Sequence, residues 1–259
     1  MLPEQPELSA HSPILDGDEG AFTPQIPVSA REPFWNYADL ALIIGLVIAS
    51  IVLIIMGVGA LAVFNPKLRQ DPTPLLLPTQ LLLYGFIYVA FRLVFRLRYG
   101  NPVFSSLGWR RSGVNLWVVG VGGALLAIVV SALATLLHTP KVPSPIDKLT
   151  ETPWSLAVFG VMAVTVAPLF EEMMFRGFLQ PLLSRSFGVM AGILVTAALF
   201  GGLHAPEYDW AWQYAVAVSL AGAVFGWLRA RTGSIIPSTV MHGCYNALFV
   251  IALAFEKHK

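Results

Sequence analysis

Cysteine and charge are both scarce in this chain, and each shortage excludes a class of protein. The single cysteine, Cys244, rules out an intramolecular disulfide and any cysteine-rich metal site. Charged residues make up only 12% of the 259 positions, whereas soluble domains contain about 25%. The net charge of +1 gives no sign of a strongly charged partner, so no nucleic-acid binding is expected.

Hydrophobic residues take the place of the missing charges, at 56% of the chain. Several apolar runs reach the length of about 20 residues that crosses a bilayer. We therefore expect an all-α, polytopic transmembrane bundle, because lipid offers backbone groups no partner outside the helix itself. Seven apolar segments are visible, at about 38–64, 74–95, 114–137, 154–185, 188–204, 212–229 and 235–254. The fourth is too long for one straight crossing and carries Pro168 as a potential kink, which gives seven or eight membrane helices.

Composition also divides the chain into regions. Residues 1–34 are polar and contain proline and acidic residues, lack the features of a signal peptide, and are predicted to be a disordered tail. Residues 35–113 hold the first membrane helices, 114–254 form a helical core, and 255–259 are a short tail. Of the 16 Lys and Arg residues, nine fall on one predicted membrane face and six on the other, with Arg176 inside the membrane. This bias favours a cytoplasmic N-terminus.

Two adjacent glutamates, Glu171 and Glu172, lie in the oily string APLFEEMMFRGFLQ, with Arg176 one helical turn later. Charged groups at membrane depth cost kilocalories each, so they are usually functional. Three more polar side chains lie in apolar segments: His204 in the fifth, and His242 and Asn246 in the seventh. Two further polar groups are expected to be structural, Asp39 as a hydrated helix end and Gln180 as an interhelical hydrogen-bonding residue.

Simple geometry relates these groups to one another. A short turn near 185–188 makes the fourth and fifth segments a hairpin, which places the glutamates about 21 Å and His204 about 24 Å from that turn. Glu172 and Arg176 are four residues apart and can pair on one helix face. That pairing leaves Glu171 free to face another neighbour, such as His204. Cys244 points away from His242, so a Cys–His nucleophile is not expected and Cys244 is interpreted as a packing residue.

Each polar group alone has a structural interpretation. A buried His is often a core residue whose hydrogen bonds are all made within the protein, and a buried Glu–Arg pair can hold two helices together. Together, however, a carboxylate, two imidazoles and a carboxamide supply the base and the hydrogen-bond donors of a hydrolytic site.

The three motifs resemble those of a known family. Glu171–Arg176 resembles the EExxxR motif of the CAAX-protease and bacteriocin-processing (CPBP, or Abi) family of intramembrane proteases. Phe200–His204 resembles its FxxxH motif and His242–Asn246 its HxxxN motif, and the resemblance covers about residues 115–254. It implies a membrane-embedded endopeptidase that cleaves a membrane-associated peptide or protein.

The same resemblance implies a role for each motif residue. Glu171 would be the general base and would hold the attacking water together with His204. His242 and Asn246 would donate to the oxyanion, and Glu172 with Arg176 would support the site. The family was named as metalloproteases, and Glu171, His204 and His242 could supply a zinc set with water in the fourth position. The glutamate mechanism is preferred, so no metal is expected and zinc remains the alternative.

Two other functions stay open on the sequence alone: a proton-coupled transporter, because buried Glu and His also mark proton paths, and a non-catalytic membrane scaffold. The lipid bilayer is the one partner that the sequence implies, and the peptide or protein substrate is not readable. The short chain resembles bacterial members, for which we expect a multi-pass protein of the inner (cytoplasmic) membrane rather than one acting on prenylated substrates.

Overall fold

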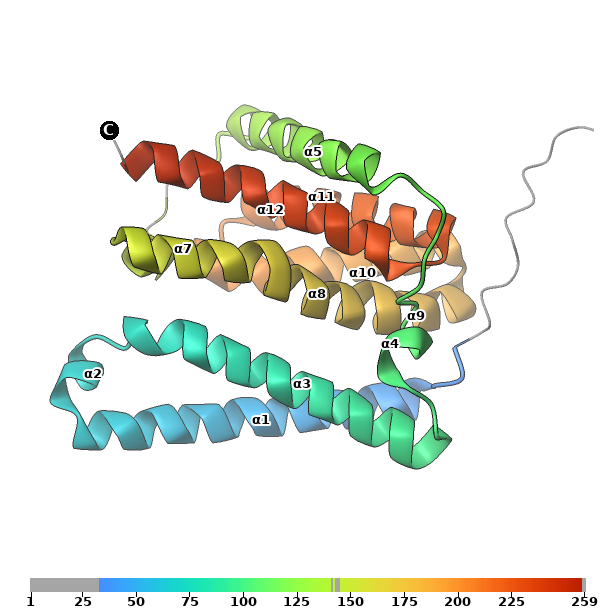
Figure 1. Ribbon diagram of the computed structural model, residues 1–259, viewed down its shortest axis with the longest axis horizontal. Coiled ribbons are helices and arrows are strands. Elements are labelled where there is room, and N and C mark those ends of the chain that lie inside the picture. Colours follow the sequence, from blue (N-terminus) through green and yellow to red (C-terminus); the bar gives the residue numbers. More distant parts are fainter. Residues whose placement is uncertain (1–32, 141, 143–144, 258–259) are drawn as a thin grey trace, which may run out of the picture.

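The computed structural model describes residues 33–140, 142 and 145–257, and the predicted tail at 1–34 therefore lies almost wholly outside the described residues. In this part of the chain all regular structure is helical, as predicted (Figure 1). The helices are α1 (Tyr37–Phe64), α2 (Pro66–Gln70), α3 (Leu76–Tyr99), α4 (Val103–Ser106), α5 (Leu116–Leu136), α6 (Pro145–Leu149), α7 (Pro153–Val161), α8 (Ala167–Glu172), α9 (Gln180–Phe187), α10 (Val189–His204), α11 (Trp212–Thr232) and α12 (Ile235–Lys257).

Six helical stretches of the described chain are long and apolar enough to cross a membrane, so the protein is an integral, multi-pass membrane protein. They are 37–64, 73–99, 116–136, 153–187, 189–208 and 235–256. The remaining predicted segment forms α11, which is less apolar and carries Gln213, Arg229 and Arg231. Because α11 packs against α5, α10 and α12, the bundle itself covers much of this helix.

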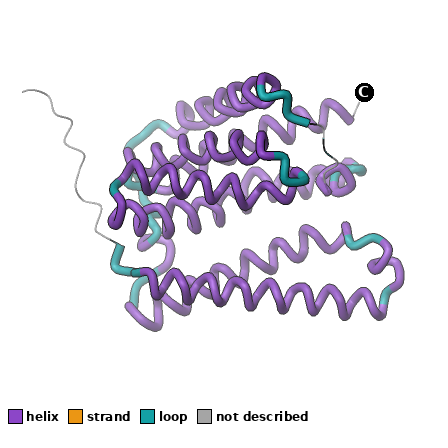
Figure 2. Tube along the Cα trace, turned by 180° about the vertical axis from the view of Figure 1, so that it is seen from behind, coloured by secondary structure: helices purple, strands orange, loops and turns teal. Residues whose placement is uncertain are grey.

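Helices α1 and α3 form an antiparallel hairpin that lies beside the other helices (Figures 1 and 2). Asn36 caps the start of α1, and its side chain accepts from the backbone N–H groups of Ala38 and Asp39. Contrary to the expectation of a hydrated end residue, Asp39 is fully buried. Its carboxylate accepts from Arg98 and from the hydroxyl of Tyr99, both at 2.6 Å, and these donors replace the water.

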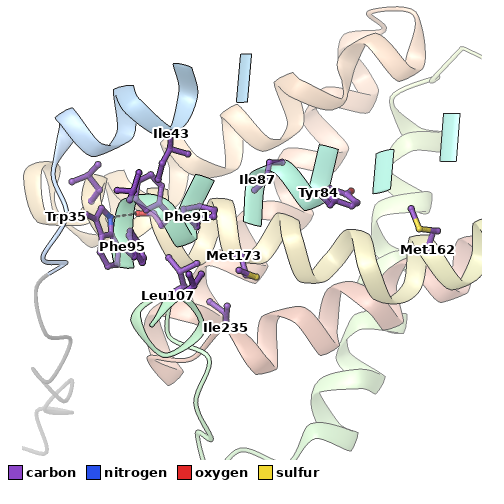
Figure 3. Close-up of a cluster of buried hydrophobic side chains, with 14 residues drawn as sticks. Trp35, Ile43, Tyr84, Ile87, Phe91, Phe95, Leu107, Met162, Met173 and Ile235 are labelled. Carbon is purple, nitrogen blue, oxygen red and sulfur yellow. Dashed lines mark hydrogen bonds between the residues drawn. The ribbon is translucent and has the colours of Figure 1, made fainter. Parts of the chain in front are cut away.

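An aromatic cluster joins the hairpin to the core near the start of α1 (Figure 3). Trp35 packs against both Phe95 of α3 and Phe178 of the core, whose rings also contact each other, and its indole N–H donates to the carbonyl of Phe178 at 3.1 Å. Phe91 meets Phe178 edge to face, a geometry that suits the ring quadrupoles. The hairpin is therefore fixed to the core at this end of the bundle.

The long fourth segment runs from Pro153 to Phe187 without a break in its helical path, but two π-turns interrupt the α-helix at 162–166 and 173–179. Each π-turn lies just before a proline, Pro168 or Pro181, which has no N–H to donate. The predicted kink at Pro168 thus takes the form of a π-turn. π-Helical turns are rare in proteins, and those that do occur are often found at functional sites.

Each π-turn leaves one backbone carbonyl without a helical donor. The N–H of Ala167 bonds to Met162 instead of Ala163, and the next residue is Pro168, so Ala163 keeps a free carbonyl. Side chains from other helices donate hydrogen bonds to both of these carbonyls. Asn246 Nδ2 donates to the Ala163 carbonyl at 2.8 Å, and Arg229 Nε donates to the Arg176 carbonyl at 3.2 Å.

Candidate active site

Glu172 and Arg176 form a fully buried ion pair on one face of the fourth segment. Arg176 Nη1 lies 3.0 Å from Glu172 Oε1, which confirms the pairing predicted from the four-residue spacing. Both side chains have no exposed surface. Since a buried charge is costly unless it is paired, each residue requires the other.

The surroundings of Arg176 explain how a guanidinium is accommodated inside the bundle. Its Nη2 donates to the carbonyl of Gly222 on α11 at 2.8 Å. The guanidinium lies over the ring of Phe200 at 4.5 Å and over that of Phe225 at 5.4 Å, both favourable cation–π positions. A methyl group on Gly222 would come within 3.0 Å of Nη2, so glycine at this position permits the close approach.

The same contact repeats one turn further along both helices. Gln180 Nε2 donates to the carbonyl of Gly226 at 2.9 Å, as predicted for an interhelical hydrogen-bonding residue. Arg176 and Gln180 therefore fix the fourth segment against α11 in one register.

His242 of α12 lies between the two glutamates. Its Nδ1 is 3.1 Å from Glu172 Oε1, and its Nε2 is 3.7 Å from Glu171 Oε2. The ring stacks on Phe225 and meets Phe200 edge to face. Glu172 accepts from Nδ1–H, which holds the ring with Nε2 directed toward Glu171.

Glu171 is the open member of the pair, with 19% of its side chain exposed. The hydroxyl of Tyr84 donates to its Oε1 at 3.4 Å. Tyr84 belongs to α3 and stacks on Phe170, the residue before Glu171, with ring centroids 4.8 Å apart. The sequence analysis did not identify Tyr84, and nothing local distinguishes it from the other aromatic residues of its segment.

The predicted approach of Glu171 to His204 is not found as a hydrogen bond or ion pair in the described part of the chain. His204 Nδ1 bonds to the Phe200 carbonyl at 2.7 Å, one turn earlier on α10. The prediction counted 100° per residue along a regular α-helix, whereas the π-turns at 162–166 and 173–179 change that phase. His204 nevertheless lies near the group, because Phe200 contacts the rings of both His204 and His242, with centroids 4.5 and 5.7 Å apart.

A third carboxylate lies near the site, and the sequence analysis missed it. Glu207 follows His204 in the short 3-10 turn 205–208, and its charge acts on both His204 and Glu171. Its position three residues after the FxxxH motif was the available signal.

Asn246 reaches the site from α12, one turn beyond His242. One of its amide hydrogens satisfies the free carbonyl of Ala163 at the first π-turn. The second hydrogen remains for another acceptor, since a carboxamide nitrogen carries two. Asn246 thus connects the shape of the fourth segment to the position of a hydrogen-bond donor.

The alternative zinc set of Glu171, His204 and His242 does not fit these positions. Over the described residues, no three His, Cys, Asp or Glu side chains are close enough together to hold one metal ion. The zinc alternative and its metalloprotease designation therefore gain no support, and no step of the mechanism is assigned to a metal.

Comparison with known proteins gives one result. Residues 152–248 match the family described as type II CAAX prenyl endopeptidase Rce1-like, and this range contains all three motifs. No curated protein and no solved structure matches the chain. The three motifs and this match agree: residues 152–248 are similar to the type II CAAX prenyl endopeptidase Rce1-like family, which supports the resemblance to the CAAX-protease and bacteriocin-processing endopeptidases.

Proposed function

We propose that the protein hydrolyses a peptide bond of a membrane-associated substrate, with Glu171 as the general base. The observation that carries this proposal is the contrast between the two glutamates. Glu172 is fully buried and paired, while Glu171 is partly exposed beside an imidazole nitrogen at 3.7 Å. This contrast supports Glu171, rather than Glu172, as the residue that meets a water molecule and a substrate.

In the proposed reaction Glu171 takes a proton from water, and the hydroxide oxygen bonds to the scissile carbonyl carbon. The C–N bond then breaks, and the proton held by Glu171 passes to the leaving nitrogen, which gives a carboxylic acid and an amine. Positioned proton transfer of this kind contributes about 10²- to 10⁴-fold to a rate.

The other site residues have distinct tasks in this mechanism. His204 donates Nδ1–H to the Phe200 carbonyl, which leaves Nε2 as an acceptor for the water. His242 in its protonated form donates Nε2–H to the oxyanion, and Glu172 holds the ring for that task. The second amide hydrogen of Asn246 is the other oxyanion donor. Tyr84 positions the carboxylate of Glu171.

We propose a location in a bacterial inner membrane, and the arginine distribution supports an orientation with the N-terminal end of α1 toward the cytoplasm. Eight described arginines belong to the end of the bundle where α1, α5, α10 and α12 begin: Arg92, Arg96, Arg98, Arg110, Arg111, Arg185, Arg229 and Arg231. Arg31, the ninth of the sequence prediction, lies outside the described residues. Cytoplasmic loops are the ones that carry such an excess.

A Glu171→Gln variant tests the proposal, because it removes the base and keeps nearly the same shape. Inactive full-length protein expressed in native membranes is used to trap substrates, which are then offered to purified wild type in proteoliposomes made in H2 18O. We expect one 18O atom in the new carboxyl group and a turnover about 10²- to 10⁴-fold lower for Glu171→Gln. The melting temperature of the variant should stay near that of wild type. A folded Glu171→Gln protein with full activity would show that another group is the base.

A further inference from the structure

Two arginines, Arg110 and Arg229, bind backbone carbonyls at the arginine-rich end of the bundle, where the chain leaving α4 crosses the turn between α11 and α12. Arg110 Nε donates to the carbonyl of Gly233 at 2.9 Å. Arg229 Nε donates to the carbonyl of Arg176 at 3.2 Å, and the Gly233 N–H in turn caps the carbonyl of Arg229. Each arginine thereby uses Nε for the protein and keeps its terminal nitrogens for another acceptor.

Two glycines allow the two arginine side chains to approach the backbone closely. A methyl group on Gly108 would lie 2.7 Å from Arg229 Nη2, and one on Gly233 would lie 2.9 Å from Arg110 Nη2. Both glycines also have positive φ, at 87° and 64°, which favours glycine. The Ile235 N–H donates to the carbonyl of Gly108 and so joins the start of α12 to the chain that follows α4.

Among the described residues neither Arg110 nor Arg229 forms a salt bridge with a carboxylate, although the charge of Glu172 acts favourably on Arg229. The positive charge of Arg110 acts unfavourably on that of Arg229. The one described carboxylate at this end outside the active-site segment is Asp39, which is already bound to Arg98 at 2.6 Å. Two neighbouring cations without a carboxylate attract an anion, and the planar fork of arginine suits phosphate oxygens.

An open apolar groove of about 350 Å³ includes Trp109, the residue before Arg110, in its lining. Trp109 lines one end of it, and α8 and α12 lie side by side along it, on the near side of the molecule in Figure 1. The other lining residues are Val164, Thr165, Leu169, Thr239, Val240, Gly243 and Cys244. The lining is almost wholly apolar, which suits a hydrocarbon chain and excludes a free polar anion as its occupant.

We propose that Arg110, Arg229 and this groove form a binding site for an anionic phospholipid. The phosphate lies on the two guanidinium groups, and one acyl chain enters the groove past Trp109. Charge complementarity selects the headgroup, and the apolar lining selects the chain. Arg229 also holds the carbonyl of Arg176, so the lipid site and the active-site segment share one residue.

Native mass spectrometry of the delipidated full-length protein tests the site without any measurement of proteolysis. The probes are phosphatidylglycerol and phosphatidylcholine with identical acyl chains, titrated in a neutral detergent. We expect wild type to prefer phosphatidylglycerol about tenfold, and Arg110→Gln to bind it about fivefold more weakly with phosphatidylcholine unchanged. Arg110 is exposed, so this substitution should leave the fold intact, whereas Arg229→Gln would also remove the donor to Arg176.

Two further variants separate the headgroup from the chain. Arg92→Gln removes an exposed charge from the same end of the bundle, away from the groove, and should not change either affinity. Thr165→Trp fills the groove from its exposed side and should weaken both lipids.

Two results would overturn the proposal. Equal losses for Arg92→Gln and Arg110→Gln would indicate a diffuse charged surface. A site for a free anion only would be indicated by two results together: millimolar inorganic phosphate displaces phosphatidylglycerol, and Thr165→Trp binds both lipids with unchanged affinity. Because binding is the readout, neither result depends on Glu171 or on cleavage.

Discussion

The two faces of the fourth segment are built in opposite ways. The closed face holds Glu172 and Arg176, both without exposed surface, against Gly222 and two phenylalanine rings. The open face holds Glu171, which is partly exposed and has only a 3.4 Å contact from Tyr84 and a 3.7 Å contact from His242. His242 contacts both glutamates. Under the proposed mechanism, the closed face positions His242 and the open face carries the base.

The largest expected effect on stability comes from breaking the closed face. Arg176→Met leaves the buried carboxylate of Glu172 without its guanidinium partner, which should lower the free energy of unfolding by about 3–5 kcal/mol. Unfolding in mixed micelles, followed by tryptophan fluorescence, measures this loss. Replacing both partners together, with Glu172→Met and Arg176→Met, should recover most of it, because two apolar side chains carry no unpaired charge.

The double variant separates the two faces. It should unfold near wild type and yet cleave poorly, because His242 has lost the carboxylate that holds its Nδ1. A double variant as unstable as Arg176→Met alone would mean that the closed face does more than pair two charges.

A smaller effect is expected at the first π-turn. Asn246→Leu leaves the Ala163 carbonyl without a donor and should cost about 1–3 kcal/mol of unfolding free energy. Turnover should also fall, because the proposed oxyanion donor is removed. In a Pro168→Ala background position 168 regains an N–H, so the stability cost of Asn246→Leu should shrink while its effect on turnover remains. Equal stability costs in both backgrounds would show that Asn246 does not compensate for Pro168.

Much of this architecture could be predicted from local spacing. Long apolar runs required membrane helices, and a four-residue interval was enough to pair Glu172 with Arg176. The hairpin between α9 and α10 also followed from the sequence, and it turns at Gly188 with φ of 85°. In each case the determining groups are within a few residues of one another or within one helix.

What could not be predicted depends on partners distant in the sequence. Pro168 and Pro181 can be read in the sequence, but a π-turn is stable there only if a side chain donates a hydrogen bond to the carbonyl that the turn leaves free. Asn246 and Arg229 do so from 83 and 53 residues away. The burial of Asp39 has the same cause, because its donors, Arg98 and Tyr99, belong to α3.

The smallest effect tests whether the open face has a positioning residue. Tyr84→Phe removes one hydroxyl and keeps the ring that stacks on Phe170. A neutral hydrogen bond is worth about 0.5–1.5 kcal/mol, so kcat should fall about two- to tenfold. KM should stay unchanged, because the hydroxyl contacts Glu171 rather than the substrate. Tyr88→Phe is the matched control, since Tyr88 lies one turn further along α3 and contacts Phe104 through its ring. An equal loss of kcat in both variants would assign the effect to the packing of α3, and an unchanged Tyr84→Phe would leave Glu171 positioned by His242 alone.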